Sequence, residues 1–154
     1  MSTSSSPSPL LPVSLDAGND TVPMGVVHAR LGFPSPADDC LAEAINLHEL
    51  LVRKPLATFL CRAEGDSMIG AGILDGDILV VDRSVRPRHG DLVLACWDGN
   101  QPCCKYLRLF EDHLELHSAN PEHAPIVLDG SAEVQVFAVV GIARQVRRHF
   151  LQAG

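Results

Sequence analysis

The chain has 154 residues, of which 46% are hydrophobic and 20% charged, and this composition excludes a chain that is disordered throughout. Its formal net charge of −7 at pH 7 excludes a broad phosphate-binding face, so we expect no direct sequence-specific DNA binding. There is no apolar run of about 18 residues and no basic segment ahead of Leu10 and Leu11. We therefore expect neither a membrane span nor a signal peptide, and a cytoplasmic location.

The N-terminal arm, residues 1 to about 22, is rich in Ser, Pro, Asp and Gly and lacks helical or strand periodicity. Such a segment cannot bury enough apolar surface to offset the entropy lost on ordering, so we expect disorder. Whether part of the arm pairs with the folded body stays open at this stage.

One or two short helices are expected after the arm. Ser35 followed by Pro36 is typical of an N-cap with a first-turn proline. Apolar residues then keep a helical spacing over residues 41–51, ahead of Pro55. Asn46 offers an alternative start, as the cap of a second short helix within that stretch.

From Thr58 onward, short segments with strand character alternate with turn signals such as Asp98-Gly99. Because no long helix separates them, they predict a mostly β domain of antiparallel strands. The expected strands are residues 58–63, 78–82, 92–97, 103–110, 114–118 and 134–142.

Ser67 is a candidate nucleophile, because Gly65 two places earlier allows a sharp turn that presents a hydroxyl and neighbouring backbone amides. A serine needs a base at neutral pH. Lys105 lies at the start of an apolar predicted strand, where burial disfavours the charged ammonium and the neutral amine can accept a proton. The alternative is an edge-strand lysine whose amine reaches water.

Other polar residues give weaker signals. The histidines are expected at solvated surface positions, since no feature of the sequence links one to Ser67. Arg144, Arg147 and Arg148 are expected on a solvated or partner-facing tail. The five cysteines form no C-x-x-C pair and are odd in number, which predicts reduced thiols and no metal site. The histidines and cysteines considered are His89, His113, His117, His123, Cys40, Cys61, Cys96, Cys103 and Cys104.

Several ordered motifs together resemble the LexA and UmuD family of self-cleaving SOS-response proteins. The likeness runs from Gly32 to about Arg147, so it covers most of the chain. The motifs are Gly32-Phe33-Pro34-Ser35-Pro36, Gly65-Asp66-Ser67-Met68, Asp75-Gly76-Asp77 with its following strand, His89-Gly90-Asp91, and Lys105 in a β hairpin.

The resemblance implies a Ser-Lys serine protease that acts on itself without a cofactor. In that reading Ser67 attacks the Leu31–Gly32 peptide bond and neutral Lys105 removes the serine proton. In the same reading, backbone N–H groups of Asp66, Ser67 and Met68 form the oxyanion hole.

The resemblance also implies an organisation and a set of partners. Residues 1–31 would be a flexible arm removed by self-cleavage, and residues 32–154 the LexA/UmuD-like protease and interaction domain. A RecA filament would stimulate cleavage, and the shortened homodimer would join a UmuC-like subunit in an error-prone translesion polymerase. The alternative is a non-catalytic interaction module of such a polymerase complex.

The turn at residues 98–102 leaves one assignment open. It is one residue longer than the family pattern, and without that insertion Cys104 rather than Lys105 falls at the base position. We prefer the insertion, because turn tips tolerate added residues and the spacing after Lys105 is then kept. A one-residue slip in a strand sends a side chain to the opposite face, so the choice matters.

Overall fold

The main feature of the computed structural model, which describes residues 11–12, 22–24 and 43–146, is an antiparallel sheet of eight strands. In sheet order the strands are β1 (Leu11–Pro12), β4 (Thr58–Arg62), β5 (Ile78–Asp82), β10 (Val134–Ala143), β6 (Leu92–Trp97), β7 (Cys103–Leu109), β8 (His113–His117) and β9 (Ile126–Asp129). The remaining elements are the paired strands β2 (Val22–Met24) and β3 (Glu43–Ile45), helix α1 (Leu47–Leu51), and the 3-10 turns η1 (Pro55–Ala57) and η2 (Ile69–Ala71).

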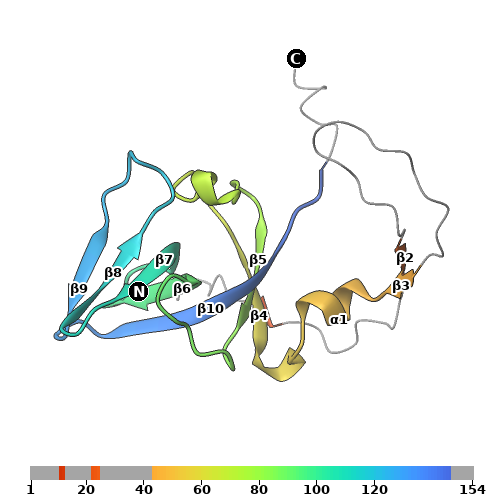
Figure 1. Ribbon diagram of the computed structural model, residues 1–154, viewed down its shortest axis with the longest axis horizontal. Coiled ribbons are helices and arrows are strands. Elements are labelled where there is room, and N and C mark those ends of the chain that lie inside the picture. Colours follow the sequence, from red (N-terminus) through yellow and green to blue (C-terminus); the bar gives the residue numbers. More distant parts are fainter. Residues whose placement is uncertain (1–10, 13–21, 25–42, 147–154) are drawn as a thin grey trace, which may run out of the picture.

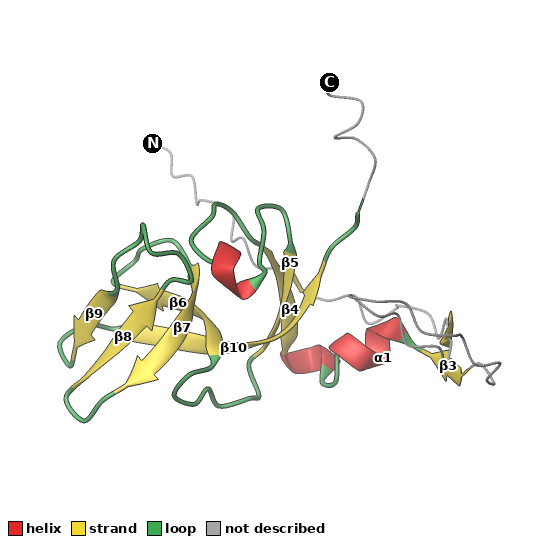
Figure 2. Ribbon diagram, turned by 45° about the horizontal axis from the view of Figure 1, so that its top comes forward, coloured by secondary structure: helices red, strands yellow, loops and turns green. Residues whose placement is uncertain are grey.

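Strand β10 joins the two halves of the sheet (Figure 1). Its residues 134–138 pair with β6, and residues 138–143 pair with β5 beyond a register shift between Val139 and Gly141. Such irregularities bend a strand and increase its twist. Helix α1 and strand β3 lie on the opposite side of β4 from strands β6 to β9 (Figure 2).

Strand β6 is buried on both faces. Val93, Leu94 and Ala95 are each at most 1% exposed, and successive side chains in a strand point to opposite faces. Leu94 belongs to one apolar cluster, whereas Val93 and Ala95 belong to a second. The first cluster also contains Phe59, Cys61, Met68, Ile73, Leu79 and Val81, and the second Leu107, Leu116 and Leu128.

All six strands predicted from the sequence are present, with bounds that differ by at most one residue, so the antiparallel β domain is confirmed. The prediction missed β9, a four-residue edge strand directly after Pro125. It also missed β1 to β3, which have two or three residues each and carry no periodicity of their own.

The helix prediction is half right. Asn46 is the N-cap of α1, and its side-chain oxygen accepts a hydrogen bond from the Glu49 N–H at 3.1 Å, as the sequence indicates. The helix expected before it is wrong where the structure describes the chain, because residues 43–45 form β3 and pair with β2. Pairing with a partner strand overrides the local helical spacing there. The helix start expected at Ser35 lies outside the described residues.

The expected disorder of the arm does not hold for Leu11 and Pro12, which pair with Leu60 and Phe59 at the edge of the sheet. Backbone bonds to an existing strand edge order a segment whose own side chains offer little burial. No helix in the described ranges is long and apolar enough to cross a membrane.

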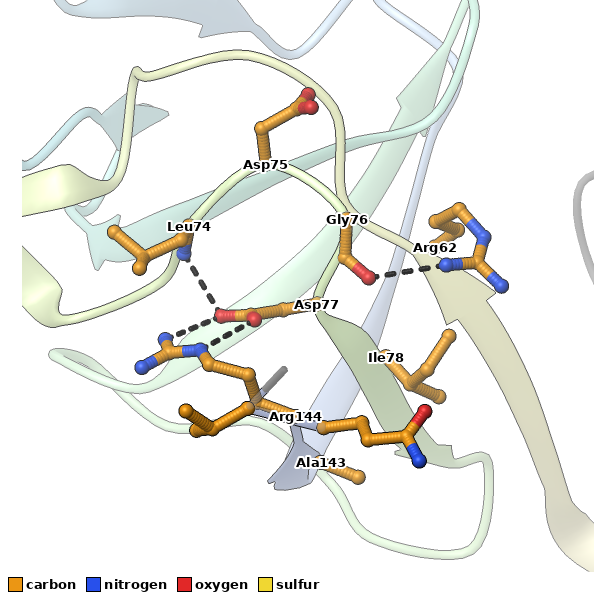
Figure 3. A pocket seen from close by; sticks show the side chains of 10 residues that line it. Arg62, Leu74, Asp75, Gly76, Asp77, Ile78, Ala143 and Arg144 are labelled. Carbon is orange, nitrogen blue, oxygen red and sulfur yellow. Dashed lines mark hydrogen bonds and ion pairs between the residues drawn. The ribbon is translucent and has the colours of Figure 1, made fainter. Parts of the chain in front are cut away.

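Arg144 is held by an ion pair, which differs from the expectation that it lies on a solvated or partner-facing tail. Its Nε and Nη2 atoms each lie 2.6 Å from a carboxylate oxygen of Asp77, and Nη2 also donates to the Gly72 carbonyl at 2.6 Å (Figure 3). Asp77 is buried and accepts a further bond from the Leu74 N–H at 2.8 Å. This bidentate pair ties the end of β10 to the turn before β5. Arg147 and Arg148 lie outside the described residues.

Replacing Asp77 by Asn tests this pair. The hydrogen bonds from Arg144 lower the pKa of Asp77, so its stabilising contribution exists above the unfolded-state value, about 4, and disappears as pH falls through the folded-state value. We expect Asp77→Asn to lower the melting temperature at pH 7, and the deficit to shrink below about pH 4.

Thermal unfolding from pH 7 to pH 3, with the exposed Glu111→Gln variant as control, measures this difference. A deficit that stays constant with pH would argue against the ion pair as its cause.

Candidate active site

The N-terminal flank of the loop that carries Ser67 is fixed by the turn before β5. Gly65 has φ of 88°, a conformation open to glycine but strained for other residues, and its N–H donates to Asp75 Oδ1 at 2.8 Å. Two backbone bonds of 2.8 Å join Ala63 to this turn, one to the Asp77 carbonyl and one from the Gly76 N–H. The Asp75-Gly76-Asp77 motif therefore shapes the nucleophile loop.

Ser67 is half-buried and lines a small cavity of about 60 Å³. Most of the side chains around the cavity are apolar, which suits an aliphatic side chain better than a charged one. The other lining residues are Cys61, Arg62, Ala63, Glu64, Gly65, Met68, Ile73, Leu79, Leu94, Pro102 and Cys104.

The backbone N–H groups at the nucleophile point to no acceptor within the described ranges. Those of Asp66, Ser67 and Met68 make no hydrogen bond there, whereas the next N–H, that of Ile69, donates to the Asp66 carbonyl at 3.2 Å. Adjacent donors without partners beside a serine hydroxyl are what stabilisation of an oxyanion requires.

Lys105 lies in β7 opposite Val93 and is 8% exposed. Its Nζ donates to the Ser118 hydroxyl at 2.8 Å, and among the described residues no carboxylate lies within ion-pair distance of it. The lysine is therefore neither an exposed edge residue nor a member of an ion pair.

Ser67 and Lys105 are each linked to the segment that follows β8. The Ala119 N–H donates to the Ser67 carbonyl at 2.8 Å, and the residue before it, Ser118, binds Lys105. No hydrogen bond joins Lys105 Nζ to Ser67 Oγ in the described part of the chain. Cys104, which points to the other face of β7, lines the Ser67 cavity.

The turn ahead of β7 has the geometry of a two-residue hairpin loop. Asp98 and Gly99 both have positive φ, 47° and 76°, and the Asn100 N–H donates to the Trp97 carbonyl at 2.8 Å. Positive φ at both central residues is the requirement of a type I′ turn, which Asp-Gly favours. The turn signal in the sequence is thus confirmed.

One extra residue follows this turn. Strands that continued in register from it would pair Val93 with Cys104, whereas the observed ladder pairs Val93 with Lys105. An unpaired residue therefore lies between Asn100 and Cys103. It shifts β7 by one position, and so puts Lys105 rather than Cys104 on the face that Ser118 shares.

Asp66, the neighbour of Ser67, is held by the segment after β8. Its carbonyl accepts from Asn120 Nδ2 at 3.1 Å, and its carboxylate lies 3.0 Å from His123 Nε2. No local pattern in the sequence links a histidine to the nucleophile, because this contact joins loops 57 residues apart.

The other described histidines lie away from Ser67. His113 and His117 are half-buried and share Glu115, at 3.0 and 2.8 Å, so the expected solvated positions are wrong for these two. His89 is exposed, as expected, and accepts from the Leu109 N–H at 2.9 Å. Within the described residues no group of three or more His, Cys, Asp or Glu could hold a metal ion.

The four described cysteines are free thiols, and two of them, Cys61 and Cys104, line the Ser67 cavity. Burial raises the pKa of Cys104 to about 12. A thiol with that pKa stays protonated near neutral pH, so Cys104 cannot replace Lys105 as a base there.

Comparison with known proteins gives a consistent family signal. A family profile described as Peptidase S24-like matches residues 23–141, a range that includes Leu31, Ser67, Lys105 and Ser118. The chain is 40% identical over 108 residues to Protein ImpA of Salmonella typhimurium, covering 69% of this chain and 74% of ImpA.

Two further relatives extend this picture. Identity to Protein SamA of Salmonella typhimurium strain LT2 is 38% over 120 residues, or 78% of this chain and 82% of SamA. Identity to the LexA repressor of Syntrophotalea carbinolica is 37% over 116 residues, or 72% of this chain and 55% of the repressor.

The thiol of Cys104 provides a test of the cavity. With a pKa near 12 and a half-buried position, it should resist iodoacetamide in the folded protein at pH 7.5 and react after unfolding. Mass spectrometry of peptides from folded and denatured samples measures the modification, and the denatured sample shows that the reagent is active. Rapid labelling of Cys104 in the folded state would contradict the packing around Ser67.

Proposed function

Since the chain belongs to the Peptidase S24-like family, we propose that it is a self-cleaving serine protease in which Ser67 attacks the chain's own Leu31–Gly32 bond. One observation carries the proposal. Ser67 lies at a cavity lined mostly by apolar residues, beside three N–H groups that bond to no acceptor in the described residues. The scissile bond itself lies outside the described residues.

The proposed chemistry proceeds through an acyl-enzyme. Neutral Lys105 takes the proton of the Ser67 hydroxyl while Oγ bonds to the Leu31 carbonyl carbon, and the carbonyl electrons move onto oxygen. The N–H groups of Asp66, Ser67 and Met68 stabilise that oxyanion. Lys105 then passes its proton to the Gly32 nitrogen as the peptide bond breaks. Water, deprotonated by the same amine, hydrolyses the ester and regenerates Ser67.

The surroundings of Lys105 support its role as the base. It is 8% exposed, and its one hydrogen bond within the described residues goes to a neutral hydroxyl rather than to a carboxylate. A lysine that stabilised the fold by an ion pair would have an acidic partner. Apo catalytic contacts are often long, so the missing Ser67–Lys105 hydrogen bond is compatible with transfer once substrate enters.

The cavity beside Ser67 supports Leu31 as the residue ahead of the cleaved bond. Its lining includes Met68, Ile73, Leu79 and Leu94, whose side chains match an aliphatic group. A glycine on the leaving side, Gly32, lets the substrate strand bend at the point of attack.

Cleavage would act as a switch in the SOS response. Residues 1–31 form the arm that is removed, and residues 32–154 the domain that remains. A RecA filament stimulates the reaction by favouring the arm position in which Leu31 reaches the cavity, since the catalytic groups belong to this chain. The shortened homodimer then joins a UmuC-like subunit of a translesion polymerase.

Changing Leu31 tests the cavity as the binding site of that side chain. Leu31→Asp should slow cleavage about 100-fold or more, because a carboxylate loses hydration beside Met68, Ile73 and Leu94, while the Arg62 guanidinium in the lining already donates to the Gly76 carbonyl. Leu31→Met, which is similar in volume, should stay within about tenfold of the unmodified protein. Rates of fragment formation measured by gel and mass spectrometry compare the two. Equal cleavage rates for the Leu31→Asp and Leu31→Met variants would show that the side chain at position 31 does not bind in this cavity.

The catalytic assignments are tested by incubating the purified full chain with RecA, an ATP analogue and single-stranded DNA. We expect a fragment that begins at Gly32 from the unmodified protein, and none from Ser67→Ala or Lys105→Ala. Intact-mass spectrometry identifies the cleaved bond. Loss of each group removes an essential chemical step rather than binding.

Absence of the fragment from every sample would favour the alternative of a non-catalytic interaction module. Cleavage that persists in Ser67→Ala would show that a contaminating protease is responsible.

A further inference from the structure

The Ser118 hydroxyl is the one group in the described residues that hydrogen-bonds Lys105 Nζ, at 2.8 Å. We propose that Ser118 is a positioning residue, which holds the Lys105 amine so that its lone pair can face Ser67. This inference rests on the proposed function, because it assigns a role within that reaction.

The chemistry of a lysine base explains why such a residue is needed. A neutral amine has two N–H donors and one lone pair, and it rotates freely about its last carbon–nitrogen bond unless a donor is fixed. Lys105 would donate one N–H to Ser118 Oγ, which limits the directions of the lone pair. After proton transfer the ammonium keeps that bond and gains a third N–H, which is the proton delivered to the leaving nitrogen.

The position of Ser118 follows from strand pairing. Tyr106 of β7 pairs with His117 of β8, so Ser118 lies one step along, across from Lys105. Both side chains leave the same face of the two strands. The Lys105–Ser118 contact therefore continues the register of the β7–β8 pair by one residue beyond β8.

Ser118 also connects the base to the nucleophile. Its neighbour Ala119 donates to the Ser67 carbonyl at 2.8 Å and accepts from the Gly70 N–H at 2.7 Å. Ser118 bonds the Lys105 amine and is covalently joined to Ala119, which bonds the Ser67 backbone. The positions of Ser67 and Lys105 are therefore coupled through residues 118 and 119. Misplacement of a catalytic group by about 1 Å costs on the order of 100-fold in rate.

The activity test compares side chains of equal size. Thr and Val have nearly the same shape, but Thr keeps the hydroxyl. We expect Ser118→Ala and Ser118→Val to slow self-cleavage about 10- to 100-fold, and Ser118→Thr to stay within about threefold of the unmodified protein. Melting temperatures of all variants show whether a loss of rate reflects unfolding.

A second measurement does not depend on cleavage. The chain has two lysines, Lys54 and Lys105, of which Lys54 is exposed. In protein labelled with ¹⁵N-lysine, in the Ser67→Ala background that keeps the chain intact, Lys105 should give an amine signal protected from solvent exchange. That signal should persist in Ser118→Thr and be lost in Ser118→Val, while the Lys54 signal stays unprotected in both.

The outcomes separate this inference from the proposed function. If the unmodified protein does not cleave, the proposed function fails, and the amine signal still decides whether Ser118 holds Lys105. If Thr and Val at position 118 give equal cleavage rates, or if the Lys105 amine is unprotected in the intact chain, Ser118 is not a positioning residue.

Discussion

The close approach of Gly70 to Ala119 is the constraint on which the candidate site depends. A Cβ atom at position 70 would lie 2.5 Å from the Ala119 carbonyl oxygen, so the backbone bonds between these segments require glycine there. Through them the loop after β8 is fastened to the loop of Ser67, and Ser118 brings Lys105 to the same place. The two candidate catalytic groups come from chain segments far apart, and each is bonded to this junction, Ser67 through its carbonyl to Ala119 and Lys105 through its amine to Ser118.

The sequence predicted what local patterns determine. Short segments of strand character, bounded by turn signals, marked the six longer strands, and Asp98-Gly99 marked a turn that needs two positive φ angles. It could not predict the Asp77–Arg144 pair or the Ser118–Lys105 bond, because each depends on strand order and register. The helical spacing before Asn46 misled for the same reason, since β3 exists through its pairing with β2.

The register of β7 against β6 connects the length of the turn at residues 98–102 to the placement of Cys104 and Lys105. From the sequence, either Cys104 or Lys105 could occupy the position expected for the base. The extra residue after Asn100 sets the register in which Lys105, and not Cys104, pairs with Val93. Cys104 packs toward the cavity with a thiol whose pKa is near 12, while Lys105 reaches the polar hydroxyl of Ser118. A single inserted residue in an exposed turn thus decides which side chain faces Ser118 and which faces the Ser67 cavity.

Self-cleavage changes what the fold must provide. When the substrate belongs to the same chain, proximity is supplied by covalent connection, and one turnover is enough. The protein then needs no deep substrate cleft, and the cavity beside Ser67, of about 60 Å³, is correspondingly small. What must be precise is the direction of the base and of the oxyanion donors, because connection to the substrate fixes neither. Strand pairing holds Lys105 here, and short backbone bonds to Ala119 and to the turn before β5 hold the loop of Ser67.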